Sequence, residues 1–531
     1  MPTQAWACHP FACLINRNQL AEYAMTFRPK PETRNVIART PGTPGLRWLR
    51  TSASLLLAAV CIQIAGCPKP APDRPDTTNQ PSLAGVKLRL QVVDDAAIAA
   101  AVGQLRGEWE TQTGSELQVE QITEERLLKA ESPAADVLVC HCCQLGALAE
   151  RKLIAPVPEK LKRHDGGPWA GIFELPKLRE SAWGNQVLSV PFGSPVFVCY
   201  YRADLLKRLG HRPPQTWAEY QKLAEVLGKL PTDRRQPGDA AAAGRTPWSG
   251  TLEPLGPGWA ALVLLARAAP YAKHRDSYSA LFDPDTMQPL VAGEPFIRAL
   301  EELAATAGRG SPDQLRYDPS AVRAAFWRGE CGMALSWPTA ADQPQAAADI
   351  DAGFAELPGS EKVYHVESQS WETRPADHDS RVPLLTVAGR LGVVSARSDH
   401  REAAFELLFW LSGQRLSPQV CAASDATTLF RHSHLADPAL WVEKPVSLAA
   451  ATDYAEMTEN TFRRQQSLFA PRIPGRRQYL AALDTAVRAA VQNEKSPAEA
   501  LQQVARQWNE ITGRLGIEKQ KSAYLHSLGL E

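Results

Sequence analysis

The most constraining feature of this sequence is an apolar stretch, residues 189–206, that breaks in its middle. It begins as a strand, is interrupted at Pro191 and Gly193, continues as a second apolar and aromatic strand, and ends where a helix begins. Proline removes a backbone donor and fixes φ, whereas glycine accepts backbone conformations that other residues avoid. A strand broken in this way can leave one sheet and enter another. The stretch therefore predicts a crossover between two lobes, with a ligand site at their seam.

The chain before this stretch alternates between predicted strands and predicted helices. The apolar spacing indicates strands at 86–93, 117–122 and 135–139, and helices at about 96–113 and from 145 onward. This alternation predicts a parallel sheet with helices on its faces. In open sheets of this kind, ligands bind beyond the carboxyl ends of the strands. The polar residues at such ends are Asp94, Asp95, His141 and Cys142.

The amino-terminal region is expected to direct export rather than to join the fold. Residues 52–66 are uncharged and apolar, follow two arginines, and are fewer than the roughly 18–20 residues of a spanning helix. We therefore expect residues 1–66 to be a signal peptide. Ile-Ala-Gly-Cys, ending at Cys67, resembles the lipobox of bacterial lipoproteins, in which the chain is cut before a cysteine that carries diacylglycerol. The alternative is a chance cysteine. Residues 67–84 are then expected to be a lipid-anchored tether.

The cysteines beyond Cys67 fall at 140, 142, 143, 199, 331 and 421. The sequence alone does not define their pairing. His141 lies among three of them, but no second pair of ligands follows at a zinc-like separation. Neighbouring residues of a strand also point to opposite faces. We therefore expect disulfides or buried thiols in this part of the chain, and no metal.

Charge and motifs argue against several classes of function. The chain has 58 basic and 58 acidic residues, so no basic excess is present to neutralise the phosphates of a nucleic acid. The sequence contains no Gly-x-Ser-x-Gly elbow, no His-Glu-x-x-His and no phosphate-binding loop. Asp94 and Asp95 are adjacent, so they are poor candidates for the opposed carboxylates of a glycosidase. We expect neither an enzyme nor a cofactor, and a secreted hydrolase is the less favoured alternative.

Several segments, in order along the chain, resemble extracellular solute-binding proteins of the maltose-binding type, which serve ABC importers. They are Glu-Trp-Glu-Thr-Gln-Thr-Gly at 108–114, Asp-Val-Leu-Val at 136–139 with the helix after it, the opening stretch extended to Tyr220, Ala-Phe-Trp-Arg-Gly at 325–329 with the strand after it, and the apolar helix at 402–411. The resemblance implies an α/β protein with the two-lobed periplasmic-binding-protein type II fold, discontinuous lobes and a central ligand cleft.

The chain is expected to cross back between the lobes near Gly389. Together with the crossing in the opening stretch, this sets the expected lobe boundaries. Lobe 1 is expected at 86–192 plus 386–428, and lobe 2 at 193–385 plus 429–531. Residues 231–250 are polar and rich in alanine and glycine, so we expect a variable surface loop there. Residues 340–385 are an excursion that the pattern does not place.

The expected ligand contacts combine aromatic and polar side chains. Trp337 follows a predicted strand and Trp259 precedes a predicted helix, and an aromatic face packs well on the C–H face of a pyranose. The alternative for both tryptophans is that they pack in a core. For Phe192 and Tyr200, the sequence leaves open whether the side chain points into the cleft or into a lobe. The resemblance also places Arg472 near the cleft. The full candidate set is Asp94, Asp95, His141, Phe192, Ser194, Tyr200, Trp259, Trp337, Arg390 and Arg472.

The resemblance implies a lipid-anchored, extracytoplasmic monomer that captures a small ligand, a sugar or oligosaccharide, by hinge closure. Contacts from both lobes would favour the closed state, which an ABC permease would recognise. The alternative is a binding protein that presents its ligand to a signalling partner.

Overall fold

The computed structural model describes residues 83–163, 167–230, 248–346, 350–375 and 378–530. These residues belong to one unit of the chain, which spans Thr77–Glu531. The predicted signal peptide, Cys67 and nearly all of the predicted tether lie outside the described residues.

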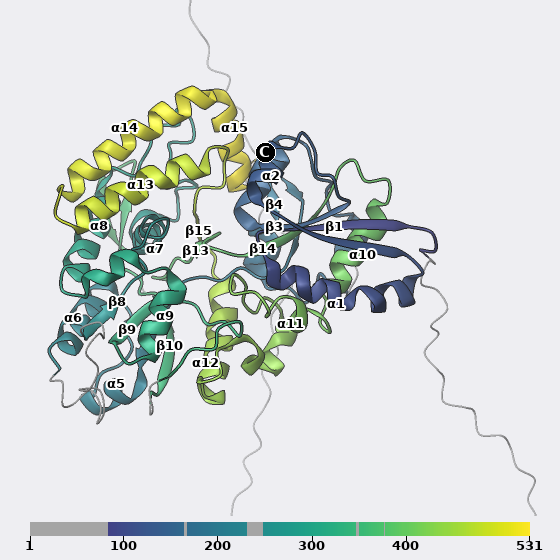
Figure 1. Cartoon of the computed structure of the whole chain (residues 1–531). Helices are drawn as coiled ribbons and strands as arrows, with labels where there is room; N and C mark the ends of the chain where they lie inside the picture. The colour runs from purple at the N-terminus through teal and green to yellow at the C-terminus, as the bar shows by residue number, and fades with distance from the viewer. Residues whose placement is uncertain (1–82, 164–166, 231–247, 347–349, 376–377, 531) are drawn as a thin grey trace, which may run out of the picture. The chain divides into compact units, whose positions relative to one another are not determined.

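The first sheet has the strand order β2-β1-β3-β14-β6 (Figure 1). Its strands are β1 (Lys87–Val93), β2 (Glu116–Ile122), β3 (Val137–His141), β6 (Val190–Pro191) and β14 (Arg390–Val394). β1 is parallel to β2 and β3, whereas β14 is antiparallel to β3 and β6. Two distant parts of the chain therefore share one sheet. The carboxyl ends of β1 and β3 place Asp94 and His141 at the same edge.

Helices pack around this sheet. They are α1 (Ala96–Thr113), α2 (Glu124–Lys129), α3 (Leu145–Glu150), α4 (Glu159–Lys162), α10 (Arg401–Leu411) and α11 (Ser417–Val420). α1 begins after Asp95, whose side chain accepts a hydrogen bond from the Ile98 amide, and it ends at Gly114, which has a φ of 74°. Both ends follow ordinary capping chemistry, and the predicted glycine end is confirmed.

The second sheet has the order β10-β7-β9-β8. Its strands are β7 (Val198–Arg202), β8 (Ser249–Leu252), β9 (Cys331–Ser336) and β10 (Ala352–Glu356). β7 is antiparallel to β9 and β10, and β8 is parallel to β9. The opening stretch thus passes from β6 of the first sheet to β7 of the second.

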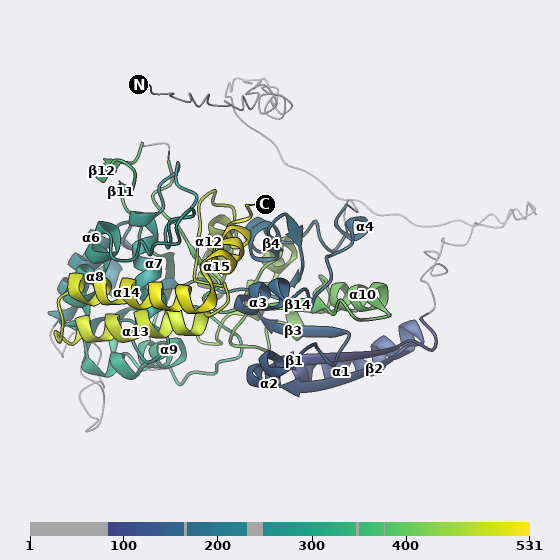
Figure 2. The same ribbon diagram turned by 90° about the horizontal axis from the view of Figure 1, so that it is seen from above.

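The helices of this second half are α5 (Ala203–Leu209), α6 (Trp217–Gly228), α7 (Ala260–Ala272), α8 (Glu294–Ala307), α9 (Pro319–Trp327), α12 (Leu448–Phe462), α13 (Arg476–Val491), α14 (Pro497–Leu515) and α15 (Ile517–Leu528). α13 and α14 lie side by side, and α13 also packs on α7 (Figure 1, Figure 2). The predicted caps are confirmed: Thr216 accepts from the Glu219 amide, and Ser496 forms a capping box with Glu499. Shorter turns are η1 (Cys142–Gln144), η2 (Pro176–Glu180), η4 (Pro312–Arg316), η5 (His432–Ala436) and η6 (Pro438–Trp441).

One prediction about a loop is corrected, and the excursion that the sequence left unplaced is located. The last residues of the predicted loop at 231–250 belong to β8, which is buried along its whole length, whereas 231–247 lie outside the described residues. The 340–385 excursion contains β10 and a hairpin of β11 (Lys362–His365) and β12 (Ser370–Thr373), which packs on α7 and α8. A further hairpin joins β4 (Ala182–Trp183) to β5 (Gln186–Val187).

Within the described residues, two segments connect the two sheets, at 192–197 and 386–389. A third segment, 470–475, passes beside the second of them on its way to α13. β13 (Leu384–Leu385) pairs in parallel with β15 (Leu468–Phe469) between the two sheets (Figure 1). Gly193 and Gly389 have φ values of 105° and 119°, and a Cβ at Gly389 would overlap Ser194. These connections therefore pack too closely for larger residues.

All six cysteines that the structure describes are buried and unpaired, so they are thiols rather than disulfides. Among the described residues, no helix is long and apolar enough to cross a membrane. The same residues hold no group of three or more His, Cys, Asp or Glu side chains that could bind a metal ion.

Candidate ligand-binding site

Three aromatic rings pack against one another near the segment that leads from the first sheet to the second. Trp259 is the residue before α7, Trp337 follows β9, and Phe197 comes from the first connecting segment. The ring centroids of Trp259 and Trp337 are 5.7 Å apart, and those of Phe197 and Trp337 are 5.8 Å apart. Trp337 is only 4% exposed, whereas Trp259 is half-buried. Trp337 therefore supports Trp259, and Trp259 is the more exposed of the two rings.

Hydrogen bonds fix the position of Trp337. Its indole Nε1 donates to the carbonyl of Asp425 at 2.8 Å. Its own carbonyl accepts from Arg323 Nη1 at 3.2 Å, and the Arg323 guanidinium lies 5.8 Å from its ring centroid. Arg323 is itself held by the carboxylate of Asp342 at 2.9 Å. Hydrogen bonds therefore hold both the indole and the backbone of Trp337.

A polar group lies on the side of the first sheet. Asp95 pairs with Arg390, with 2.9 Å between Oδ2 and Nε, and it accepts from the hydroxyl of Ser424 at 2.6 Å. The other oxygen of Asp95 caps α1 through the Ile98 amide at 3.0 Å. Each oxygen of this carboxylate therefore has a partner that fixes it, and Asp95 and Arg390 hold each other at the sheet edge.

The turn at Ser424–Asp425 joins these two groups. It contacts Asp95 through Ser424 and Trp337 through Asp425, so a chain of contacts runs from Arg390 to Trp337. Asp425 is an exposed residue, yet its carboxyl is partly shielded from solvent, and this desolvation raises its pKa. We call Asp95, Trp259, Trp337, Arg390 and Asp425 the interlobe site. Asp425 was not predicted, because nothing in its local sequence distinguishes it from an ordinary turn residue.

Asp94 and His141 lie beside the interlobe site. Asp94 adopts a φ of 48°, its carboxylate accepts from the Glu124 amide at 2.9 Å, and its carbonyl accepts from Arg390 Nη2 at 3.4 Å. His141 is the β-sheet partner of Arg390, and its Nδ1 accepts from the Cys143 amide at 3.1 Å. Burial, with the charges of Arg476 and Arg390, lowers the pKa of His141 well below its ordinary value. His141 is therefore a neutral acceptor.

Two predicted ligand contacts lie in the cores instead. Phe192 is fully buried and packs where a Cβ of Gly392 would meet its ring. Tyr200 is also fully buried, donates to Glu443 Oε1 at 2.9 Å and packs edge-to-face on Phe354 at 4.8 Å. Both faces of the β7 sheet are covered, so an aromatic there can point into a core. The structure does not bring either residue to the interlobe site.

Ser194 and Arg472 belong to the connecting segments rather than to the interlobe site. The Ser194 side chain hydrogen-bonds to Glu180, which also accepts from the Thr386 amide at 3.1 Å. Arg472 donates to the carbonyls of Glu180 at 3.1 Å and Ser527 at 2.7 Å. The two connections and the 470–475 segment therefore meet around Glu180, and burial raises the pKa of that carboxyl to about 7. Sequence reasoning missed this carboxylate.

A second unpredicted carboxylate orients the helix that follows Trp259. Asp484 of α13 accepts from the Ala261 amide at 3.3 Å, and the Gly258 and Ala260 amides also bond to it. Burial raises the pKa of the Asp484 carboxyl, and these amides oppose that rise. A carboxylate at a helix amino terminus satisfies free amides and complements the helix dipole. Asp484 therefore fixes the start of α7 and with it the position of Trp259.

Two α/β lobes joined by crossing segments, with aromatic and charged residues near these segments, are typical of two-lobed binding proteins. The family model for bacterial extracellular solute-binding proteins matches residues 94–415. The chain belongs to this family. Its fold is the two-lobed type II fold that the sequence predicted.

Solved structures show the same fold. The sugar-binding protein MalE from Xanthomonas citri aligns with a TM-score of 0.61 and 20% identity, over 81% of this chain and 98% of the other. An ABC transporter solute-binding protein from Agrobacterium radiobacter K84, in complex with ribitol, aligns with a TM-score of 0.58 and 18% identity, over 81% of this chain and 100% of the other. Maltose-bound MalE3 from T. maritima aligns with a TM-score of 0.57 and 16% identity, over 80% of this chain and 99% of the other. No curated protein matches the chain in sequence.

Proposed function

We propose that this protein captures a sugar or sugar alcohol in the interlobe site and delivers it to an ABC importer. The observation that carries the proposal is the half-buried ring of Trp259, which packs on Trp337, while the Ser424–Asp425 turn joins Trp337 to Asp95 and Arg390. An aromatic face suits the C–H surface of such a solute, and charged groups suit its hydroxyls. The ligands of the similar structures, ribitol and maltose, agree with this class.

The mechanism that we propose is closure of two lobes about the segments that connect them. The lobes comprise 86–192 plus 386–428 and 193–385 plus 429–531. Asp95 and Arg390 belong to the first lobe and Trp259 and Trp337 to the second, so a ligand between them gains contacts from both. A ligand shifts a conformational equilibrium by its differential affinity for the two states. The closed state is then the form that the permease recognises.

We further propose that Cys67 carries a lipid that holds the protein at the membrane outside the cytoplasm. The support is the Ile-Ala-Gly-Cys sequence that follows the apolar run. Cys67→Ser is expected to release the protein into the soluble fraction after cell lysis and ultracentrifugation. Retention of this variant in the membrane pellet would contradict anchoring through Cys67.

A thermal-shift screen tests the proposed ligand class. The protein is incubated with sugar alcohols, including ribitol and mannitol, with monosaccharides, and with maltose and longer maltodextrins. At least one of these is expected to raise the melting temperature in a saturable way, because a ligand that binds only the folded state stabilises it. Absence of any saturable shift across the panel would contradict the sugar and sugar-alcohol assignment.

A further inference from the structure

The last helix of the chain, α15, contacts both lobes. In both views it lies between α14 of the second lobe and β4 of the first (Figure 1, Figure 2). It packs on α14 and also on α3 and β4. The chain itself joins α15 to the second lobe through α14, whereas only non-covalent contacts join it to the first. A change in the separation of the lobes therefore acts on those contacts.

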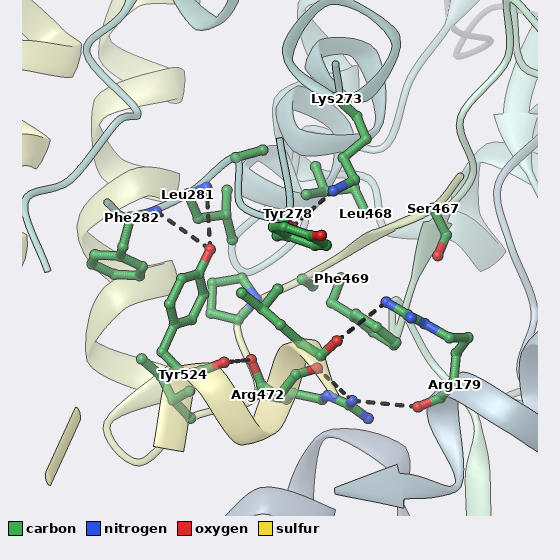
Figure 3. Close-up of a pocket in the computed structure, with 16 residues that line it drawn as sticks. Arg179, Lys273, Tyr278, Leu281, Phe282, Ser467, Leu468, Phe469, Arg472 and Tyr524 are labelled. Carbon is green, nitrogen blue, oxygen red and sulfur yellow. Dashed lines mark hydrogen bonds between the residues drawn. The ribbon is translucent and has the colours of Figure 1, made fainter. Parts of the chain in front are cut away.

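Tyr524 anchors α15 in the second lobe (Figure 3). Its hydroxyl oxygen lies 2.5 Å from the Ser279 hydroxyl and accepts from the Leu281 and Phe282 amides, both at 3.4 Å. Its ring packs edge-to-face on Phe282, with 5.2 Å between the ring centroids. Tyr524 is buried, so these contacts are shielded from water. We call this group the anchor of α15.

Two residues further along, α15 binds the first lobe through the Glu150 carboxylate. His526 Nδ1 lies 2.8 Å from Glu150 Oε1, which also accepts from Trp183 Nε1 at 2.7 Å. An ionised carboxylate only accepts, so His526 Nδ1 donates. The His526 carbonyl accepts from the Gly184 amide at 2.8 Å, and the imidazole packs edge-on to Trp183. We call Glu150, Trp183, Gly184 and His526 the latch of α15.

Arg472 holds the same end of α15 from the 470–475 segment. Its Nη2 donates to the Ser527 carbonyl at 2.7 Å and to the Arg179 carbonyl at 3.3 Å (Figure 3). Its Nη1 donates to the Glu180 carbonyl at 3.1 Å. Arg472 is buried, and a buried charged group that loses its hydrogen bonds destabilises the protein. The end of α15 is therefore also tied to the place where the connections meet.

The anchor and the latch are too close together to absorb a movement of the lobes. Tyr524 and His526 are two residues apart in one continuous helix, which is about 3 Å along its axis. A hydrogen bond is lost once its heavy atoms separate beyond about 3.5 Å, so the latch tolerates a displacement of roughly 1 Å. Domain rearrangements displace elements by more than about 2 Å. The latch and a moving lobe are therefore incompatible.

We propose that α15 is a strap between the lobes, and that its latch releases when the lobes move about their connections. The latch stabilises the arrangement of the lobes in this structure over other arrangements. A ligand that draws the lobes into a different arrangement has to break the latch, so the latch lowers the affinity for that ligand. The inference rests on the lobe movement of the proposed function, but not on the chemical class of the ligand.

Double electron–electron resonance tests the proposal by measuring the distance between the lobes. Nitroxide labels are attached through p-acetylphenylalanine at two exposed positions, Gln104 of α1 and Arg506 of α14, which leaves the cysteines unmodified, and no ligand is added. A variant that ends at Tyr524 keeps the anchor and lacks the latch. Its mean interlobe distance, or the width of the distance distribution, is expected to change by about 3 Å or more, well above the roughly 1 Å that the intact latch tolerates.

Two point variants make the result specific to the latch. His526→Ala removes one side chain of the latch and is expected to change the distribution in the same direction as the truncation, by a smaller amount. Lys521→Ala is the matched control, because it removes a contact of the same helix inside the second lobe, with Asp285 at 3.9 Å. Lys521→Ala is expected to keep the wild-type distribution.

Wild-type distributions in both the truncated chain and His526→Ala would overturn the proposal. An equal change in Lys521→Ala would also overturn it, because the effect would then come from α15 as a whole rather than from the latch. If circular dichroism shows that the truncated chain does not fold, His526→Ala alone decides the outcome. A failed sugar screen would leave these distances unchanged, so the two proposals are tested separately.

Discussion

Replacing Glu180 by glutamine tests how the two connections and the 470–475 segment are held together. Glu180 is 1% exposed and accepts hydrogen bonds from Ser194 and the Thr386 amide, and Arg472 donates to its backbone carbonyl. Burial raises the pKa of its carboxyl from 4.5 to about 7. The folded protein therefore binds a proton more tightly at this site than the unfolded chain does.

The sign and size of the pH effect follow from this shift. Between pH 4.5 and 7 the folded state holds a proton that the unfolded state releases, so stability from Glu180 falls as pH rises through this window. One pKa unit corresponds to about 1.4 kcal/mol, so the loss amounts to about 3 kcal/mol. Glutamine resembles the protonated carboxyl and does not titrate. Glu180→Gln should therefore gain about 3 kcal/mol relative to the wild type from pH 4 to pH 8.

The assay is urea denaturation of both proteins across this pH range. Comparing the two proteins cancels other titrating groups, such as the buried histidines. Glu174→Gln, an exposed glutamate close to η2, is the matched control and should run parallel to the wild type. If the curves of Glu180→Gln and the wild type stay parallel from pH 4 to 8, the carboxyl does not titrate as the buried group described above.

Two further substitutions test the packing of the second lobe. Gly250→Ala should destabilise the protein by ~3 kcal/mol or more in urea denaturation, because the added Cβ overlaps the Ala224 carbonyl. Its control, Gly103→Ala on the open face of α1, should stabilise the protein by about 0.5–1 kcal/mol. Equal effects of the two substitutions would contradict the close packing of β8 on α6. Glu253→Ala should lower the free energy of unfolding by about 3–5 kcal/mol, because it leaves the fully buried Arg267 without its partner at 2.6 Å. Replacing both residues by apolar ones should cost less. A cost of the single change below that of the double change would refute this.

Local signals in the sequence were sufficient to predict much of the fold. The helix that ends at Gly114 and the one that begins after Ser496 have their caps and apolar spacing within a few residues, so their bounds follow from nearby chemistry. β8 was missed because Ser-Gly-Thr-Leu lacks the composition of a strand. It is one because Gly250 allows close contact with α6 and because β9 lies beside it.

The site was predicted in part for the same reason. Asp95 was predicted from its place after the first strand and Trp337 from the end of its strand, whereas Arg390 was a candidate in the strand of the return crossing. The direction of Tyr200 could not be predicted, because both faces of its sheet are covered and period-two alternation does not say which face meets the ligand. Asp425 gains its role only from contacts with residues that lie far away in sequence.

The most direct test of the account is isothermal titration of three proteins with the ligand found in the thermal-shift screen. The first is the wild type and the second is Trp259→Ala. The third is Trp410→Ala, a matched control that also removes a half-buried tryptophan packed against a buried one, here Trp109 with 5.2 Å between the ring centroids. Trp259→Ala is expected to weaken binding by about 10-fold or more, since an aromatic contact contributes about 1 kcal/mol beyond its buried area. Trp410→Ala is expected to bind like the wild type, and equal affinity of all three proteins would contradict ligand binding at the interlobe site.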